Sequence, residues 1–350
     1  MGSLPSDAKI PWIQTPCVLS PELSQVTGCN IYLKLENLQP SGSFKSRGIG
    51  NFMTRAAAAA PDNLKVHFYC PSGGNAGLAC ATTAQSLGLP ATIVLPTIAS
   101  PLMRGKLSAL GADVHSVGAN WAECNAYLHE QLLSKDPGGI YVPPFDHEDV
   151  WAGASTLVDE ARTQVEGDID AFVCSVGGGG LLNGIMKGVL ECTWHDGKQP
   201  RVFALETSGA DSLNASVRAN EHVTLPAITS IATSLGALRV STQTWEHARD
   251  HPEILKSLVV SDADAAISCV RFADDARILV EPACGATLAA AYQAGRLRKE
   301  LAGISGVTDD DWRQKNVVLV VCGGSGVTLG MLTKWRETYK SESSIELGQW

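Results

Sequence analysis

A single lysine stands in a short run of small and polar residues, "LENLQPSGSFKSRG" (35–48), and this setting is the first sign of chemistry in the sequence. Taken alone, Lys45 would be read as a solvated surface residue. Gly42, Phe44 and Gly48 are poor choices for a solvent-facing helix, however, and the run reads as neither a good helix nor a good strand. A lysine withdrawn from water is the usual side chain for Schiff-base formation. Lys45 is therefore a candidate nucleophile.

Four consecutive glycines, Gly177, Gly178, Gly179 and Gly180, stand between an apolar run and "LLNGIMKGVL", which reads as a helix. Without Cβ atoms, several backbone N–H groups can turn toward one centre, and the N-terminus of the following helix adds its dipole. The alternative is a flexible surface turn, but the tight spacing favours a phosphate-binding loop. Neither GxxxxGK[ST] nor GxGxxG occurs, so the pattern supports no P-loop or dinucleotide site and implies a different phosphorylated cofactor.

Two further loops rich in Gly and Ser follow apolar runs: "CPSGGNAG" after 66–70 and "CGGSGVT" after 317–321. In open α/β sheets, ligands bind at the carboxyl ends of the strands. We therefore expect these loops, the four glycines and the Lys45 segment to converge on one pocket. The run "CGGSGV" is similar to the nucleophile elbow of serine hydrolases, but the pattern G-x-S-x-G requires glycine where Val327 stands, which excludes that interpretation.

The elements that must position these loops alternate between Val/Ile-rich and Ala/Leu-rich segments. The expected strands are 66–70, 91–96, 113–117, 171–176, 201–206 and 316–324, and covering helices are expected at 75–89 and 157–166. Such alternation is typical of open, mostly parallel sheets with helices on both faces. The run "RAAAAAPDN" predicts a helix end that Pro61 stops.

Composition narrows the possible partners. The chain has 350 residues and a net charge of -9, which disfavours nucleic acid or an anionic membrane and favours a small molecule. No apolar run approaches the ~20 residues of a membrane helix, and the N-terminus lacks the pattern of a secretory signal. Ten scattered cysteines, several of them in apolar runs, indicate buried thiols in a reducing cytoplasm. Neither CxxC nor HExxH occurs, so we expect no transition-metal site.

Five motifs, in order and spacing, carry a resemblance to a known family: "KLENLQPSGSFKSRG", "PSGGNAGLA", "VGGGGLLNG", "EPACGA" and "VCGGSG". Together they resemble the fold type II pyridoxal-phosphate enzymes, specifically the short, single-chain L-serine/L-threonine dehydratases. The likeness runs from about residue 12 to about residue 335. It implies an α/β fold with two open, mostly parallel sheets. The implied domains are a large cofactor-binding one (1–40 plus 148–350) and a small one (41–147).

The resemblance assigns roles around pyridoxal 5'-phosphate. Lys45 would hold the cofactor covalently and act as the base at the substrate Cα, with Ser72 as a second catalytic candidate, and Phe44 would cover one face of the ring. The remaining cofactor-binding residues would be Asn75, Gly177, Gly178, Gly179, Gly180, Leu181 and Cys322, where Asn75 faces the ring 3'-oxygen and Cys322 the ring nitrogen. Without the resemblance, Phe44 and Cys322 would be read as core residues.

The substrate carboxylate would be bound through the backbone of Ser72, Gly73, Gly74 and Asn75, a segment that would otherwise be read as a helix N-cap. Glu206, with backbone carbonyls near Ala210 and Leu235, resembles the family's monovalent-cation site, for which potassium is expected. Glu206 alone would be read as a solvated acid. Pro71 stands where relatives often carry Ser, and Gly73 stands where some mammalian relatives carry Ala, which leaves the preference between serine and threonine open.

The implied activity is β-elimination of L-serine to pyruvate and ammonia, and of L-threonine to 2-oxobutanoate. A serine racemase and a cysteine synthase share the fold, although the latter family tends toward "SSGNTG" where this chain has "SGGNAG". A non-catalytic protein that binds the cofactor is an alternative of another class. The resemblance further implies a homodimer and a cytoplasmic role in amino-acid catabolism and gluconeogenesis.

Overall fold

The protein is described here by a computed structural model in which residues 9–293, 295–302 and 307–347 are placed. The chain forms two compact units, and each is described by itself. Unit 1 contains residues 9–13 and Leu38–Ala154, and unit 2 contains Gln14–Asn37 and the chain from Ser155 onward. Residues 9–13 were expected in the large domain but belong to unit 1, and the other edges differ from the expected ones by a few residues; the expected domains stay a prediction. The expectation of no secretory signal rests in part on residues 1–8, which lie outside the described residues.

Unit 2 contains a six-stranded sheet in the order β1-β2-β10-β7-β8-β9. Its strands are β1 (Cys17–Leu19), β2 (Asn30–Lys34), β7 (Ala171–Ser175), β8 (Arg201–Thr207), β9 (Leu255–Val260) and β10 (Asn316–Val320). All neighbouring pairs are parallel except β1 and β2. Strands β7 and β10 are buried along their whole length, as expected for a sheet covered on both faces.

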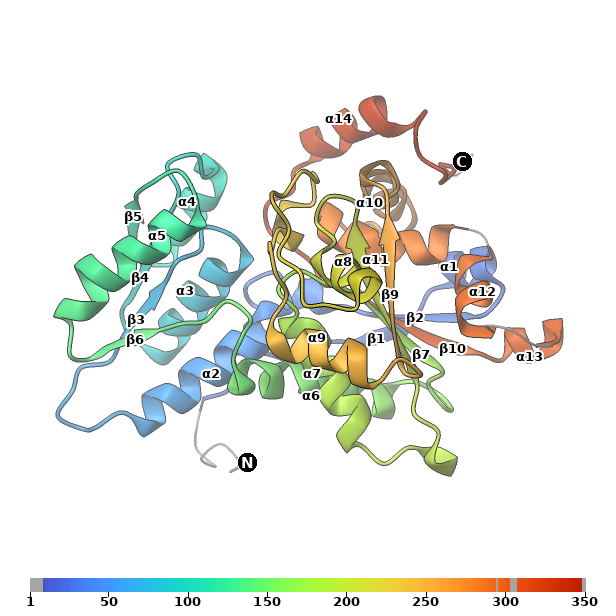
Figure 1. The fold of residues 1–350 in the computed structure, drawn as a ribbon, viewed down its shortest axis with the longest axis horizontal. Helices are drawn as coiled ribbons and strands as arrows, with labels where there is room; N and C mark the ends of the chain where they lie inside the picture. Colours follow the sequence, from blue (N-terminus) through green and yellow to red (C-terminus); the bar gives the residue numbers. More distant parts are fainter. Residues whose placement is uncertain (1–8, 294, 303–306, 348–350) are drawn as a thin grey trace. The chain divides into compact units, whose positions relative to one another are not determined.

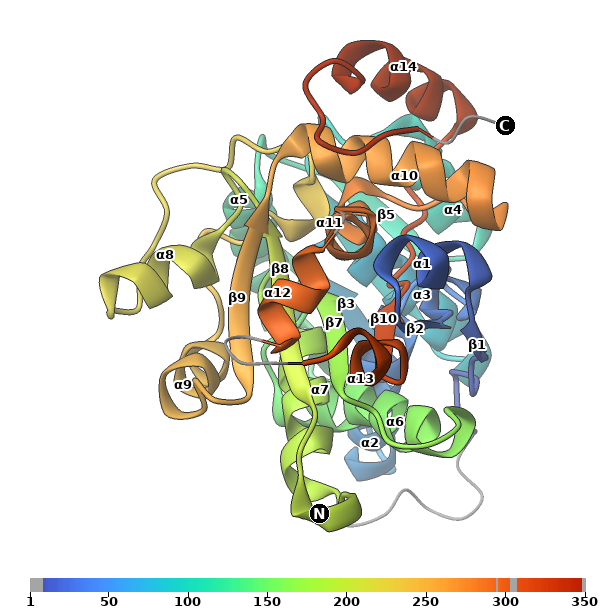
Figure 2. The ribbon, with the colours of Figure 1, turned by 90° about the vertical axis from the view of Figure 1, so that its right-hand side faces the viewer.

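Helices cover both faces of this sheet (Figures 1 and 2). On one face lie α1 (Pro21–Thr27), α10 (Asp262–Ala276) and α11 (Pro282–Tyr292), and α11, whose residues are all buried, packs on β7, β8 and β10. On the other lie α7 (Gly180–Glu191) and α9 (Thr242–Asp250). The unit also contains α8 (Ser212–Ala219), α12 (Arg296–Ala302), α13 (Asp309–Arg313) and α14 (Leu329–Tyr339), while α6 (Glu148–Gln164) contains the boundary between the units.

Unit 1 has a four-stranded parallel sheet in the order β5-β4-β3-β6. The strands are β3 (His67–Cys70), β4 (Ala91–Leu95), β5 (Asp113–Ser116) and β6 (Gly139–Tyr141). They are accompanied by α2 (Lys45–Ala59), α3 (Asn75–Leu87), α4 (Pro101–Ala109) and α5 (Trp121–Tyr127). Side chains from α2, α3, β3 and β4 share one hydrophobic core that includes Phe52, Met53, Phe68 and Ile93.

The reading of 35–48 as neither helix nor strand is wrong at its C-terminal end, because Lys45 is the first residue of α2. The glycines that argued against a helix are explained by packing: a Cβ atom at Gly48 would lie 2.7 Å from the Val150 carbonyl oxygen. The helix is buried, so close approach outweighs the low helix propensity of glycine. It ends at Ala59, just before Pro61, as predicted.

The six expected strands are confirmed as β3, β4, β5, β7, β8 and β10, and the helix expected at 75–89 is confirmed as α3. The helix expected at 157–166 forms the C-terminal part of the longer α6. Strands β1, β2, β6 and β9 were not predicted. Strands β1 and β6 have three residues each, and polar residues flank or interrupt the apolar residues of β2 and β9, so none of the four contains an apolar run longer than three residues.

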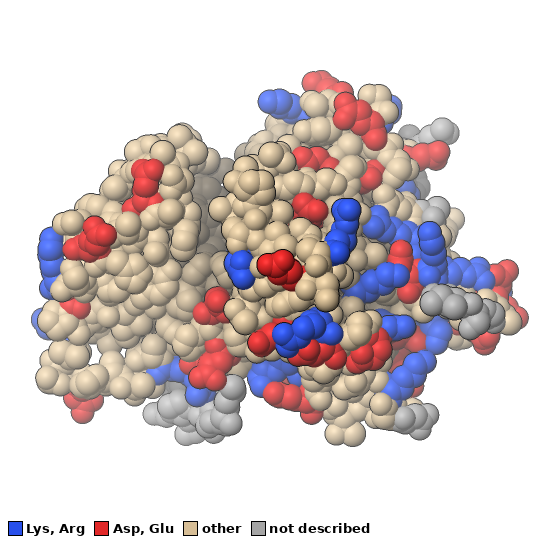
Figure 3. Space-filling view, in the orientation of Figure 1, with Lys and Arg blue, Asp and Glu red and all other residues tan. Residues whose placement is uncertain are grey.

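The surface carries mixed charge. On the face shown in Figure 3, blue and red side chains are interspersed over unit 2, and neither sign gathers into a continuous field. Among the described residues, no helix is long and apolar enough to cross a membrane. The ten cysteines are free thiols, and nine of them, including Cys70, Cys174 and Cys322, are buried as expected.

A buried ion pair fixes the end of β2 within unit 2. The Lys34 ammonium is fully buried and donates to Thr15 O (2.7 Å), Glu160 Oε2 (2.6 Å) and Gln164 Oε1 (2.8 Å). The Gln164 side chain also donates to Thr15 O (2.9 Å). These bonds tie α6 to the strand, and they place Lys34 in a structural role, because its charge is already compensated by a carboxylate.

We predict that Lys34→Met lowers the free energy of unfolding by about 3 kcal/mol, since it removes the cation that compensates Glu160. The double variant Lys34→Met/Glu160→Gln should recover part of this loss. Urea denaturation of both variants measures the difference. Equal stability of wild type and Lys34→Met would contradict a structural ion pair at this position.

Candidate functional site

Within unit 1, Lys45 lies at the N-terminus of α2 and is half-buried. Its Nζ donates a hydrogen bond to Pro144 O (2.7 Å) and lies 5.2 Å from the centroid of the Phe44 ring. The solvated-surface reading of this lysine is therefore wrong. A partly desolvated lysine beside an aromatic face is suited to bind a flat carbonyl compound covalently.

The loop Ser72–Asn75 joins β3 to α3 in the same unit, and it is held in shape by a close approach of the helix. A Cβ atom at Gly77 would lie 1.9 Å from Ser72 O, so only glycine allows the helix to reach this loop. The Gly74 N–H donates to Ser72 Oγ (3.3 Å). Gly73 packs on β4, where a Cβ atom would lie 2.8 Å from Leu95 Cβ. The loop presents small residues at a helix N-terminus, which suits a carboxylate.

Within unit 2, the four glycines form the turn from β7 to α7. Gly179, the N-cap of α7, has φ +102°, and a Cβ atom there would lie 1.8 Å from Thr244 Oγ1. Behind the turn, Ser241 N donates to Gly178 O (2.9 Å). Thr244 Oγ1 and Asn183 Oδ1 are hydrogen-bonded at 2.7 Å. The buried polar residues of α7 and α9 thus fix the backbone of the glycine turn.

This turn fits a phosphate group. Side-chain atoms are excluded from the rear of the turn by Thr244 and, at Gly177, by Leu235, whose Cα would lie 3.2 Å from an added Cβ. Gly178 O already accepts a hydrogen bond from Ser241 N. The first N–H groups of α7 have no acceptor within the helix, as at every helix start. Such a helix start, preceded by a glycine-only turn, is a known form of phosphate site. Leu181, next in the chain, is buried in the first turn of α7.

Cys322 lies just beyond the C-terminal end of β10 and is buried. Its Sγ is 3.5 Å from Ser175 Oγ, at the end of the neighbouring strand β7. Buried thiols of Cys174, Cys269 and Cys284 surround it, and burial raises the pKa of each of them. The site residue expected after β10 therefore lies beside the strand that leads into the glycine turn.

Glu206 lies near the end of β8 and is fully buried, so the solvated reading is wrong. Its carboxylate accepts hydrogen bonds from Leu213 N (2.9 Å) and Asn214 N (2.8 Å), the first turn of α8. Burial raises the pKa of Glu206 to about 8, and the two backbone hydrogen bonds oppose this shift. Such a carboxylate is suited to a cation, because a positive ion compensates the cost of burying its charge.

The other two residues expected at a cation site lie on loops that are tied to β8. Ala210 is buried and follows Gly209 (φ +86°), whose carbonyl accepts from Thr229 N (3.0 Å). The segment from Thr229 leads into the 3₁₀ turn Thr233–Leu235. Leu235 borders Gly177 of the glycine turn. The loop of the expected cation site and the expected phosphate loop are therefore neighbours in unit 2.

Sequence reasoning missed four residues that shape these loops: Gly77, Ser175, Thr244 and Glu281. Glu281 accepts from Gly326 N (2.7 Å) and from Ser234 Oγ. Gly77 lies in the recognised motif "PSGGNAGLA", and Glu281 begins "EPACGA". Asking why each position of these motifs needs its residue type could therefore have found both. Ser175 and Thr244 act through contacts far apart in the sequence, and no local pattern marks them.

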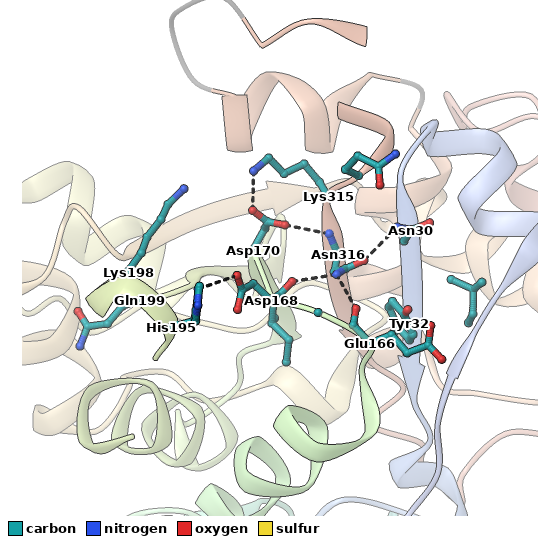
Figure 4. Close-up of a pocket in the computed structure, with 14 residues that line it drawn as sticks. Asn30, Tyr32, Glu166, Asp168, Asp170, His195, Lys198, Gln199, Lys315 and Asn316 are labelled. Atoms are coloured by element: carbon teal, nitrogen blue, oxygen red, sulfur yellow. Dashed lines mark hydrogen bonds and ion pairs between the residues drawn. The ribbon is translucent and has the colours of Figure 1, made fainter. Parts of the chain in front are cut away.

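A separate polar pocket of about 730 Å³ opens at the opposite, amino-terminal edge of the same sheet (Figure 4). There Asp170 accepts from Lys315 Nζ (2.7 Å) and Asn316 N (2.9 Å), and Asn316 Nδ2 donates to Glu166 O (3.0 Å) and Asp168 O (2.9 Å). The polar groups of this pocket thus bond to one another and join the starts of β7 and β10. None of the expected site residues lines this pocket.

Comparison with known proteins gives one coherent result. Residues 10–323 match the family model described as "Pyridoxal-phosphate dependent enzyme". The chain is 45% identical to "Serine dehydratase-like" of Rattus norvegicus over 90% of this chain and 91% of that protein. It is 40% identical to "L-serine dehydratase/L-threonine deaminase" of Homo sapiens, over 93% and 94%. A crystal structure of a fungal L-serine ammonia-lyase from Rhizomucor miehei matches with a TM-score of 0.84 at 36% identity, covering 95% of this chain and 100% of that one.

We predict that Glu206 makes the stability of the protein fall as pH rises. Its pKa is about 8 in the folded protein against an ordinary value of 4.5, so the unfolded chain loses this proton first. In a tetramethylammonium buffer, the free energy of unfolding should therefore fall by a few kcal/mol from about pH 4.5 to about pH 8. Denaturant titrations at a series of pH values measure this slope.

Glu206→Gln should flatten the slope over that range, since the amide carries no titrating proton. Glu253→Gln is the matched control, because the Glu253 side chain is 65% exposed. Superimposable pH curves for wild type and Glu206→Gln would show that the buried carboxylate does not control this dependence.

Proposed function

This chain belongs to the family of pyridoxal-phosphate dependent enzymes, and from that premise we propose that it is an L-serine dehydratase that also acts on L-threonine. The products would be pyruvate or 2-oxobutanoate, together with ammonia. The fold is fold type II, with two mostly parallel sheets flanked by helices. The observation that carries the proposal is the glycine turn at the start of α7, backed by Thr244, within a chain whose relatives are named for this reaction.

Each proposed role rests on the local geometry already described. Gly177–Gly180 and Leu181 would bind the cofactor phosphate at the start of α7. Lys45 would hold the cofactor covalently, with Phe44 against the ring, Asn75 at its 3'-oxygen and Cys322 at its nitrogen. Ser72, Gly73, Gly74 and Asn75 would bind the substrate carboxylate at the start of α3, where helix N–H groups favour an anion.

When bound, pyridoxal phosphate delocalises the electron pair that remains at the substrate Cα after its proton leaves. The chain supplies the base and the orientation. Lys45 Nζ would take up the proton from Cα, and the Ser72–Asn75 loop would fix the carboxylate so that the Cα–H bond faces that nitrogen. Ser72 has its hydroxyl at the same loop and would assist in proton transfer near the substrate hydroxyl.

We further propose that Glu206, with the carbonyls of Ala210 and Leu235, binds a monovalent cation such as potassium. Burial of the Glu206 carboxylate and the position of its loop beside Gly177 support this assignment. The proposal includes a cytoplasmic homodimer that acts in amino-acid catabolism and gluconeogenesis. Its partners would be a small amino acid and a second copy of the chain, with neither nucleic acid nor membrane.

The test is the product and the attachment site. The purified protein should release pyruvate from L-serine and carry the visible absorption band of bound cofactor. Lys45→Ala should lose that band and lower turnover by about a thousandfold or more, since a positioned base contributes on this scale. The variant Lys65→Ala, which changes an exposed lysine of the same unit, should behave as wild type.

Borohydride reduction followed by peptide mapping identifies the lysine that carries the cofactor. Attachment at Lys34 or Lys65 would overturn the assignment of Lys45. Formation of D-serine in place of pyruvate would identify a racemase instead, and bound cofactor with no turnover of either kind would leave a binding protein.

A further inference from the structure

We infer that Glu281 is a positioning residue that couples the Thr233–Leu235 turn to the loop Gly323–Gly326, so that a cation bound at the first orders the second. The inference rests on the proposed function, since Leu235 belongs to the proposed cation site and Cys322, directly before the second loop, is the proposed partner of the ring nitrogen. All of these residues belong to unit 2.

Glu281 stands at the start of α11, the helix buried beneath β7, β8 and β10. Its side chain is almost fully buried, with 8% of the residue exposed. Oε1 accepts from Gly326 N (2.7 Å), and Oε2 accepts from Ser234 Oγ. The two oxygens of one planar group therefore hold two different loops, and the group itself is fixed to a buried helix.

The loop that follows Cys322 is shaped to fit this carboxylate. Gly324 has φ +119°, and a Cβ atom there would lie 2.3 Å from Glu281 Cδ. A Cβ atom at Gly326 would lie 3.0 Å from Glu281 Oε1. The glycines of "CGGSG" thus allow the backbone to close around the carboxylate, and any movement of Glu281 must be followed by the loop.

The other end of the contact lies at the turn of the proposed cation site. Ser234 precedes Leu235, and its carbonyl oxygen would lie 3.2 Å from a Cβ atom at Gly177. The turn Thr233–Leu235 is therefore in contact with the glycine turn on one side and with Glu281 on the other. An ion that binds Leu235 O fixes this turn, and the Ser234 hydroxyl transmits the change to Glu281.

The coupling can be measured by amide hydrogen exchange of the holoenzyme in potassium chloride and in tetramethylammonium chloride. In the wild type, potassium should slow exchange in both segments, 229–236 and 322–327. In Ser234→Ala, potassium should still protect 229–236, but protection of 322–327 should fall at least threefold. Glu281→Ala, which removes both contacts, should show the same loss. Ser234→Ala leaves the Glu281 contact with Gly326 intact, so it separates coupling from folding.

Asp170→Asn is the matched control. Asp170 is also a largely buried carboxylate that accepts from one backbone N–H and one side chain, but it lies at the opposite edge of the sheet (Figure 4). This variant should lower the melting temperature and leave both potassium responses unchanged. A general loss of stability would therefore be distinguished from loss of coupling.

The outcomes separate the inference from the function on which it rests. Protection of 229–236 without protection of 322–327 in the wild type, or equal protection in wild type and Ser234→Ala, would overturn the role of Glu281 while the cation site stands. No potassium effect in either segment would remove the cation site and the inference together, whereas pyruvate formation would still support the dehydratase.

Discussion

One steric constraint governs the glycine turn of unit 2: no side-chain atom can be accommodated at Gly179. The backbone of the turn lies so close to Thr244 that a Cβ atom would fall 1.8 Å from its hydroxyl oxygen. The turn must also adopt φ +102°, which L side chains disfavour. The packing of α9 against α7 is thus possible only with a glycine turn, and that turn leaves the first N–H groups of α7 for an anion.

The same kind of close approach, which an added Cβ atom would block, recurs at the other loops. Gly77 brings α3 against Ser72 O, and Gly324 brings the loop after β10 against Glu281. The two buried acids also share a feature. Glu206 accepts hydrogen bonds from two backbone N–H groups, and Glu281 accepts from one. Lys34, by contrast, is compensated by Glu160 and serves the structure. Backbone N–H donors hold the two acidic side chains in place without supplying a full positive charge, unlike the ammonium that pairs with Glu160.

Much of this could be predicted from sequence. Buried parallel strands such as 171–176 are runs of apolar residues, and the glycine turn is recognisable from four letters. The helical conformation at Lys45 could not be predicted, because Gly48 argues against a helix. The reason for this glycine is the close approach of Val150, which is distant in the sequence. The hydrogen bonds of Glu206 come from α8, and those of Glu281 come from Ser234, 47 positions earlier in the chain, and Gly326, 45 positions later. Contacts of this kind leave no local pattern.

The most direct test of the central claim is the affinity for pyridoxal phosphate of the cofactor-free Gly179→Ala variant, measured by fluorescence titration. Gly167→Ala is the control, because Gly167 also has a positive φ (+82°) but lies before β7, at the opposite end of that strand. We predict that Gly167→Ala binds as wild type, whereas Gly179→Ala binds at least about a hundredfold more weakly, the loss of a few kcal/mol expected when charge-assisted hydrogen bonds to the phosphate are displaced. Equal affinity of both variants would contradict the assignment of the glycine turn as the phosphate site.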